Sequence, residues 1–360
     1  MIVLALVAML IPGLAWWAWL GRREQDPMVS LAQIFGISLA LISLVAESAF
    51  LLGWNFNLAG LLILLAVLFG LAVVGLIRRP WKLNKKYRYH LIVGLVLFGL
   101  TIAWRLFQAR DLLLPNWVDS QHHFLIIRVI LEKAGLPETL EPYLPVPFYY
   151  HYGFHAAAAL FTALSRLSIG AGMLIFGQIL NASISLSVYA VGKSLWRDWR
   201  PAVAGALLVS FATRMPAYYL SWGRYTLTTG LILLPLAMGL ALHLLRKNLQ
   251  KRESLTLGLL TAGVLLSHYF AGALLALFFV LLAVVYLIPR WNKPLTALLR
   301  FSPVPTGAAL GLLLAGPWLL RVVRFSTAST QVSVSLPGSM ESLFDADRWN
   351  YIWQLLSPAS

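Results

Sequence analysis

The chain has 360 residues, of which 60% are hydrophobic and only 11% are charged. Because soluble domains carry about 25% charged residues, this composition excludes a water-soluble domain and predicts an integral membrane protein. The formal net charge is +15, but the basic residues fall in short runs between apolar stretches, which is typical of membrane topology and not of nucleic-acid binding. The absence of cysteine excludes disulfides, thiolate metal sites and a cysteine nucleophile.

A membrane-spanning helix needs about 20 mostly apolar residues, and about ten stretches of the sequence are candidates. The first lacks the basic n-region and the small-residue cleavage site of a signal peptide, so we predict that it is retained. The predicted fold class is therefore an all-α, polytopic membrane helix bundle. The predicted spans are Ile2–Leu20, Leu31–Leu52, Leu58–Ile77, Leu91–Phe107, Met173–Leu195, Ala202–Ala212, Leu227–Leu245, Leu255–Tyr269, Ala271–Ile288 and Val304–Leu320.

Five connections between these stretches hold 18 of the 28 Lys and Arg residues. Basic residues accumulate in cytoplasmic loops, and all five connections share one side only if the short apolar stretch Phe154–Leu167 does not cross the membrane. We therefore predict that this stretch is juxtamembrane or re-entrant and that the N-terminus lies outside the cytoplasm. The basic connections are Arg22–Arg23, Arg78–Arg88, Lys193–Arg200, Arg246–Arg252 and Arg290–Arg300.

This topology places three segments outside the cytoplasm. The first is a long loop, residues 108–153, which is rich in aromatic residues and too long for an ordinary connection, so we expect it to hold juxtamembrane helices with a function. The others are the short loop Arg214–Tyr225 and a C-terminal segment, 321–360, whose last apolar run suggests truncation. We predict an N-terminal three-helix segment (1–90), a transmembrane core (91–320) and this outer segment.

Asp119 stands in the long outer loop just before a predicted amphipathic helix, Phe124–Lys133, and is followed by His122 and His123. Spacings of three and four residues allow all three side chains to point to one side. One interpretation is a carboxylate that accepts a proton from an acceptor hydroxyl, or binds a divalent cation, with histidine assisting. The other is structural: Asp119 caps the helix and the histidines decorate its surface.

Three further histidines and one carboxylate need an explanation. His151 and His155 have the i, i+4 spacing of two metal ligands on a helix, but the tyrosines around them equally indicate an interfacial aromatic belt. His268 lies at an outer helix end, where it either lines the same cavity as the outer loops or packs within the bundle. Glu47 lies inside an apolar stretch and is expected to be paired, neutral or turned to the bundle interior.

The second outer loop contains Arg214 and Arg224. Arginines are unexpected in an outer loop, because the positive-inside rule places basic residues in cytoplasmic loops. An arginine can bind phosphate through two hydrogen bonds, and Trp222 and Tyr225 are suited to stacking on a sugar ring. These four residues are therefore candidate substrate-binding residues, together with His151, His155 and His268. The alternative is that both arginines extend to the membrane interface as ordinary surface residues.

The order of these features resembles the GT-C glycosyltransferases, which include protein mannosyltransferases, aminoarabinose transferases and oligosaccharyltransferase catalytic subunits. The resemblance covers about Leu91 to Leu320: a helix from the cytoplasmic side, a long outer loop with Asp119 early in it, an aromatic juxtamembrane stretch and a second outer loop. The chain has Gly223-Arg-Tyr-Thr226 where some members carry an acidic pair, which leaves the need for a divalent cation open.

The resemblance implies transfer of a sugar from a polyprenyl-phosphate-type lipid donor to an acceptor hydroxyl of a glycan, lipid or protein, on the outer face of a bacterial plasma membrane. Asp119 would deprotonate or orient the hydroxyl and Arg224 would hold the donor phosphate, so the two side chains should face one outer cavity within about 10 Å.

Two alternatives belong to other classes of protein. A transporter or flippase of lipid-linked saccharide predicts several ionisable residues near the membrane midplane, where Glu47 is the one clear carboxylate. A non-catalytic membrane subunit of a cell-envelope assembly predicts that Asp119 is dispensable.

Overall fold

The computed structural model describes residues 1–21, 26–81, 83–246 and 251–332. Apart from one isolated bridge between Thr139 and Pro147, all regular structure in these ranges is helical, which confirms the predicted all-α class. Eight helices in the described ranges are long and apolar enough to cross a membrane. They are α1 (Ile2–Leu20), α2 (Pro27–Leu52), α3 (Leu58–Arg78), α4 (Arg88–Gln108), α7 (Ile169–Trp196), α9 (Tyr225–Leu244), α11 (Tyr269–Leu287) and α13 (Pro303–Val332).

The span predicted at Ala202–Ala212 is wrong. Here α8 (Trp199–Leu207) continues into a π-helical turn, η2 (Leu208–Ala212), and the chain then leaves helical conformation at Thr213. At 1.5 Å per residue, these 14 residues span about 21 Å, whereas the hydrocarbon core is about 30 Å thick. A half-length helix of this kind leaves carbonyl groups without partners at its end, and Arg105 of α4 donates to two of them.

Two other helices in the described ranges are not among these eight. α6 (Gly153–Ser165) has 13 residues and is too short to cross, as the charge pattern predicted for Phe154–Leu167. α10 (Lys251–Ser267) takes the place of the span predicted at Leu255–Tyr269; it has 17 residues and ends two residues earlier than predicted, because His268 begins α11 as its cap.

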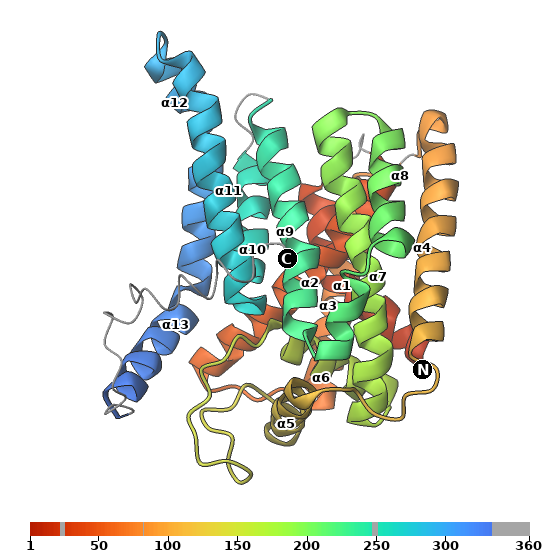
Figure 1. Ribbon diagram of the computed structural model, residues 1–360, viewed down its shortest axis with the longest axis vertical. Coiled ribbons are helices and arrows are strands. Elements are labelled where there is room, and N and C mark those ends of the chain that lie inside the picture. The colour runs from red at the N-terminus through yellow and green to blue at the C-terminus, as the bar shows by residue number, and fades with distance from the viewer. Residues whose placement is uncertain (22–25, 82, 247–250, 333–360) are drawn as a thin grey trace, which may run out of the picture. The chain divides into compact units, whose positions relative to one another are not determined.

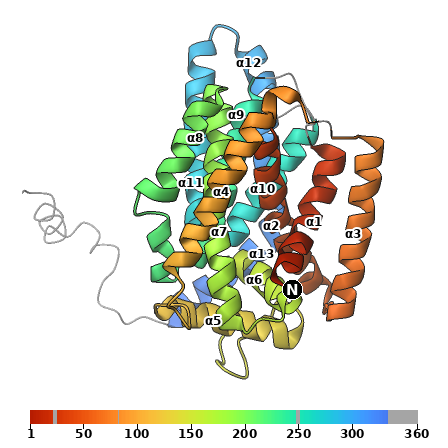
Figure 2. The ribbon, with the colours of Figure 1, turned by 90° about the vertical axis from the view of Figure 1, so that its right-hand side faces the viewer.

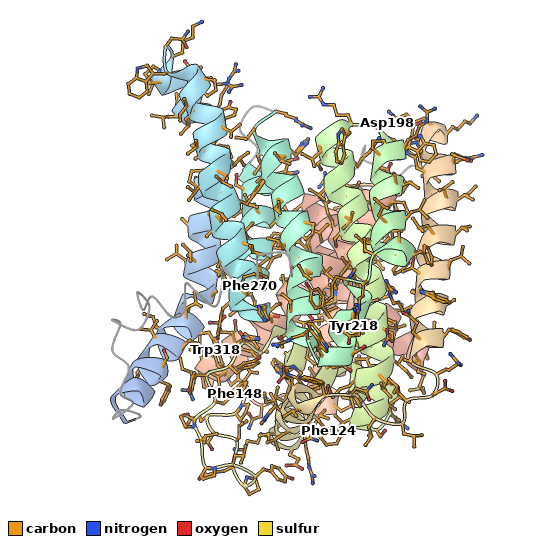
Figure 3. The ribbon with its side chains drawn as sticks, in the orientation of Figure 1. Phe124, Phe148, Asp198, Tyr218, Phe270 and Trp318 are labelled. Atoms are coloured by element: carbon orange, nitrogen blue, oxygen red, sulfur yellow. The ribbon has the colours of Figure 1, made fainter. Side chains whose placement is uncertain are left out.

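The basic connections between helices lie at one end of the bundle. Figures 1 and 2 show one end of the bundle formed by the α3–α4 and α7–α8 connections, the connection from α11 to α12 (Pro294–Phe301) and the C-terminal end of α9. They show α5 (Val118–Lys133) at the other end. In Figure 3, Asp198 lies at the first end, and Phe124 and Phe148 lie at the second. We call these the basic end and the α5 end. Three of the predicted basic connections and Arg246 of a fourth thus share one end; Arg22 and Arg23 lie outside the described residues.

Local sequence explains where α2 begins and how it is held. Asp26 caps the helix by accepting a hydrogen bond from the Met28 N–H at 3.0 Å, and Pro27 follows it, as is common at a first helical position. The same buried carboxylate lies 2.6 Å from His90 of α4 and accepts a hydrogen bond from Tyr189 of α7 at 2.8 Å. One aspartate therefore joins three spans at the basic end.

Contacts divide the chain into two units, Met1–Trp318 and Leu319–Ser360. Within the first, α1 and α2 pack against α6 and α10 as well as against each other. Glu47 of α2 is buried and accepts hydrogen bonds from the Trp318 N–H at 3.0 Å and the Tyr152 hydroxyl at 3.4 Å, so it is a packed interior residue. Of the predicted outer segment 321–360, residues 333–360 lie outside the described residues.

Candidate functional site

Asp119 lies in the first turn of α5, where the partial positive charge of the helix N-terminus favours a carboxylate. The helix begins at Val118, six residues before the predicted start, and its cap position is Trp117, so the interpretation of Asp119 as the helix cap is wrong. Trp117 has a positive φ of 76°, a strained conformation for a residue with a side chain. Strain of this kind clusters at functional sites, and here it lies two residues before the carboxylate.

Asp119 and Arg224 form an ion pair. The Arg224 Nη1 and Asp119 Oδ2 atoms are 3.4 Å apart, and the two side chains are 50% and 39% exposed. Residues far apart in the chain are thus brought within the 10 Å expected from the sequence. A partly exposed pair of this kind remains open to a third polar group, which is what an acceptor hydroxyl or a phosphate would be.

Gly223 makes this approach possible. It ends the short helix η3 (Ala217–Trp222) with a left-handed φ of 64°, a conformation that glycine adopts at little cost. A Cβ atom at this position would lie 2.9 Å from the Ser120 backbone nitrogen and 3.0 Å from the Asp119 Cβ. Only glycine therefore lets the Gly223–Arg224 turn pack directly on the first turn of α5.

The two histidines after Asp119 do not point to one side, contrary to the expectation from spacing. His122 is exposed, whereas His123 is buried between α5 and the Gly223–Arg224 turn. The His123 Nε2 donates to the Gly223 carbonyl at 2.9 Å, and its Nδ1 lies 2.8 Å from the His155 Nε2. Burial lowers the pKa of His123 to about 4, so its ring is neutral near pH 7.

His151 and His155 are not on the same helix turn, because α6 begins at Gly153. The His151 Nε2 bonds to the Thr226 hydroxyl at 3.0 Å, and its ring lies 4.6 Å from that of His268. The His268 Nδ1 accepts a hydrogen bond from the Phe270 N–H. Across the described residues no group of three or more His, Cys, Asp or Glu side chains has an arrangement that could hold a metal ion.

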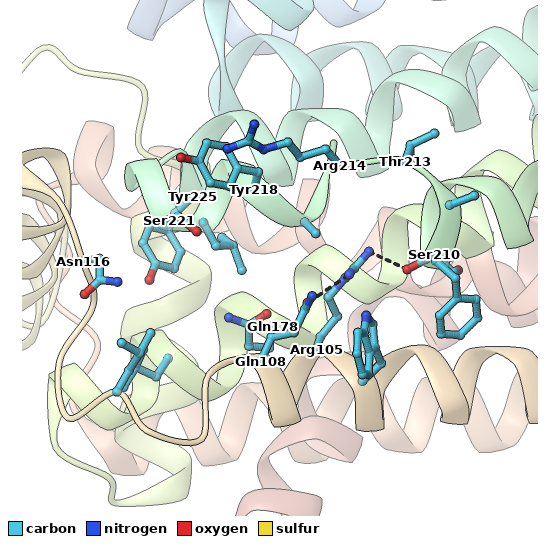
Figure 4. A pocket seen from close by; sticks show the side chains of 17 residues that line it. Arg105, Gln108, Asn116, Gln178, Ser210, Thr213, Arg214, Tyr218, Ser221 and Tyr225 are labelled. Atoms are coloured by element: carbon cyan, nitrogen blue, oxygen red, sulfur yellow. Dashed lines mark hydrogen bonds between the residues drawn. The ribbon is translucent and has the colours of Figure 1, made fainter.

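A cavity of about 430 Å³ lies between α4, α7 and the η2–η3 segment, and Tyr225, the residue after Arg224, is among the residues that line it (Figure 4). Arg105 and Arg214 line it, and no Asp or Glu is among its described lining residues. Neither Asp119 nor Arg224 lines it, so the expectation that both face one cavity is not met. Arg214 stacks on the Tyr218 ring, with its guanidinium carbon 3.9 Å from the ring centre.

Further polar and aromatic groups complete the cavity wall. The amides of Asn116 and Gln178 and the hydroxyl group of Ser221 belong to it, and the Gln178 side chain is buried within α7. Trp104 and Phe211 also line the cavity and are 43% and 45% exposed, so one side of its rim is apolar and open to the surroundings of the bundle.

The two aromatic residues predicted to stack on a sugar differ in exposure. Trp222 is 37% exposed and contacts the Tyr218 ring edge-on, with ring centres 5.0 Å apart, so part of its side chain remains accessible. Tyr225 is 2% exposed and stacks on Phe154 at 5.0 Å, so its ring offers no exposed face for stacking on a sugar, although Tyr225 is one of the residues that line the cavity. The reason is that Tyr225 is the first residue of α9 and packs against Gly177 inside the bundle.

Sequence reasoning missed Arg105, Gln178 and Gly223. The signal for Arg105 was a charge within an apolar stretch, which is costly and usually functional or paired. Gln178 carried the weaker signal of an amide in the middle of a span. Gly223 had no signal of its own, because its need for a positive φ depends on the approach of α5.

The model of one protein family matches residues 6–344. The chain belongs to DUF6541, a family of unknown function. No curated protein and no solved structure matches it. The family membership extends over both the N-terminal helices and the core, and it assigns no activity to the chain.

Proposed function

We propose that the protein is a membrane glycosyltransferase that moves a sugar from a polyprenyl-phosphate-type donor to an acceptor hydroxyl at the α5 end, outside the cytoplasm. The observation that carries the proposal is the ion pair between Asp119 and Arg224, at 3.4 Å, together with a cavity that has two more guanidinium groups and no described carboxylate. Transfer from a glycosyl phosphate needs cations for the leaving group and a base for the attacking hydroxyl.

The donor phosphate is assigned to the cavity and not to Arg224, since Arg224 already pairs with Asp119. Arg105 is buried, and in surroundings of low dielectric its positive charge has a larger effect on a phosphate than in water, while the exposed Arg214 adds a second guanidinium group to the cavity wall. The cavity volume lies within the range of about 300–1,000 Å³ that is usual for small-molecule sites. The apolar rim at Trp104 and Phe211 gives the lipid chain a path into the membrane.

Asp119 is assigned the role of base toward the acceptor. Its carboxylate is partly exposed at the α5 end and can accept a proton from a hydroxyl that enters from outside. Arg224 orients the carboxylate and stabilises its charge. The pair contains a single carboxylate, so the binding of a divalent cation remains a prediction. The roles of Asp119 and Arg224 do not depend on such a cation.

The packing of Glu47 favours an enzyme over a transporter. Both carboxylate oxygens have hydrogen-bond donors, one on Trp318 and one on Tyr152, so the midplane carboxylate has a structural role in the bundle. A coupling carboxylate in a transporter would need to face a pathway.

The test is a transfer assay with purified protein in nanodiscs and a set of polyprenyl-phosphate and polyprenyl-diphosphate sugars. Asp119→Asn should abolish release of the free lipid phosphate while the melting temperature stays within a few degrees. The matched control is His122→Gln, an exposed neighbour that should keep full activity. If Asp119→Asn transfers sugar at the wild-type rate, the assignment of the base is wrong.

A further inference from the structure

We infer that His123 and His155 form a strut of two imidazole rings that positions the Gly223–Arg224 turn against the helix carrying Asp119. His123 is thus a positioning residue of the site and not a catalytic one. The inference rests on the proposed function only where it concerns sugar transfer; the positioning itself can be tested without any substrate.

The strut holds both partners of the ion pair. His123 lies one helical turn after Asp119 on α5, and its Nε2 contacts the carbonyl oxygen of Gly223, the residue directly before Arg224. Its other ring nitrogen is anchored by His155 at the start of α6. Both rings are almost fully buried, with 3% and 0% exposure. Three segments of the chain therefore meet at one pair of side chains.

The direction of the hydrogen bonds follows from the carbonyl. A carbonyl oxygen only accepts, so the His123 Nε2 carries a hydrogen, and the neutral ring then has a lone pair on Nδ1. The His155 Nε2 must donate to that lone pair, which leaves a lone pair on the His155 Nδ1. Both tautomers are thereby fixed.

The surroundings of the His123 ring are largely aromatic. Phe154 and Tyr225, stacked on each other, meet its ring edge-on with centres 5.7 and 5.9 Å away. A ring nitrogen turned toward these aromatic faces would be buried without a partner, which is costly. The strut is therefore rigid, and loss of its donor and acceptor should release the Gly223–Arg224 turn.

Since the chain has no cysteine, single cysteines can report on this turn directly. Nitroxide labels at Gln121→Cys and Ser221→Cys, both exposed, place one probe on α5 and one before the turn. Pulsed dipolar spectroscopy in nanodiscs should give one narrow distance distribution for the otherwise unchanged protein. His123→Gln should keep it narrow, because its amide offers both a donor and an acceptor, whereas His123→Asn is too short to reach Gly223 and should broaden it.

His123→Leu should broaden the distribution further, and His122→Gln, the exposed control, should leave it unchanged. A narrow, unshifted distribution in His123→Asn overturns the inference even if His123→Leu fails to fold. In the transfer assay, His123→Asn should lose about tenfold in rate, as expected for a lost buried hydrogen bond, with rescue by His123→Gln. If no variant transfers sugar but the distances change as stated, the proposed function fails and the strut stands.

Discussion

Replacing Gly223 with alanine should break the contact between the two halves of the site. The new Cβ would lie 2.9 Å from the Ser120 backbone nitrogen, whereas ordinary van der Waals contact begins at 3.4 Å. The turn must therefore move away from α5 by about 0.5 Å, the difference between these distances. The same movement would lengthen the Arg224–Asp119 contact from 3.4 Å to about 3.9 Å, close to the limit for an ion pair.

The left-handed backbone conformation adds a second free-energy cost to the substitution. A matched control variant measures this cost by itself. A residue with a side chain in the left-handed region costs about 1–2 kcal/mol. Gly53 has the same conformation, with a φ of 65°, but no atom lies within 4 Å of the place that a Cβ would take there. Gly53→Ala therefore carries the backbone cost alone. We expect Gly223→Ala to lose a further 1–3 kcal/mol, about the usual cost of overpacking.

The assay is thermal unfolding by intrinsic fluorescence together with transfer activity, for both alanine variants. Gly53→Ala should melt slightly earlier than the wild type and retain its activity. Gly223→Ala should melt earlier still and lose activity, because the shift of the turn draws Arg224 away from Asp119. Equal melting temperatures and equal activities for the two variants would refute the close packing of Gly223 on α5.

Three other outcomes are expected. Arg105→Met should lower the free energy of unfolding by about 3 kcal/mol, because Arg105 bonds to carbonyls at the end of η2, whereas the exposed Arg110→Met should not change it. Arg214→Gln should leave the melting temperature unchanged and weaken binding of a polyprenyl phosphate, measured by native mass spectrometry, about tenfold. The folded protein should lose stability as the pH falls from 6.5 toward about 4, because burial lowers the pKa of His123, as it does for His151 and His268, and the unfolded chain binds these protons more strongly. His123→Gln should reduce this loss, measured by denaturation, by up to about 3 kcal/mol.

The membrane fold was largely predictable because it depends on one strong physical signal. Long apolar stretches identify spans directly, and the basic connections identify which ends belong together. The prediction failed at Ala202–Ala212, where an apolar stretch is only a half-length helix. Apolarity does not reveal that Arg105, far away in sequence, satisfies the carbonyls at its end.

The site was predictable in its charges but not in its packing. Asp119 and Arg224 stood out because carboxylates and outer arginines are rare in such a chain, and the structure brings them together. Whether a side chain is buried depends on three-dimensional contacts, and for this reason spacing alone grouped His122 with His123 and treated Tyr225 as a stacking surface. The cavity was invisible for the same reason: its walls come from α4, α7 and the η2–η3 segment.

The most direct measurement of the proposed sugar transfer is the release of free lipid phosphate by protein reconstituted in liposomes, with a polyprenyl-phosphate sugar in the membrane and acceptor saccharides added outside. We predict turnover by the wild type, none by Asp119→Asn, and wild-type turnover by His122→Gln. Equal turnover by all three, or sugar transfer that continues when the Asp119–Arg224 pair is removed, would contradict the role of this pair.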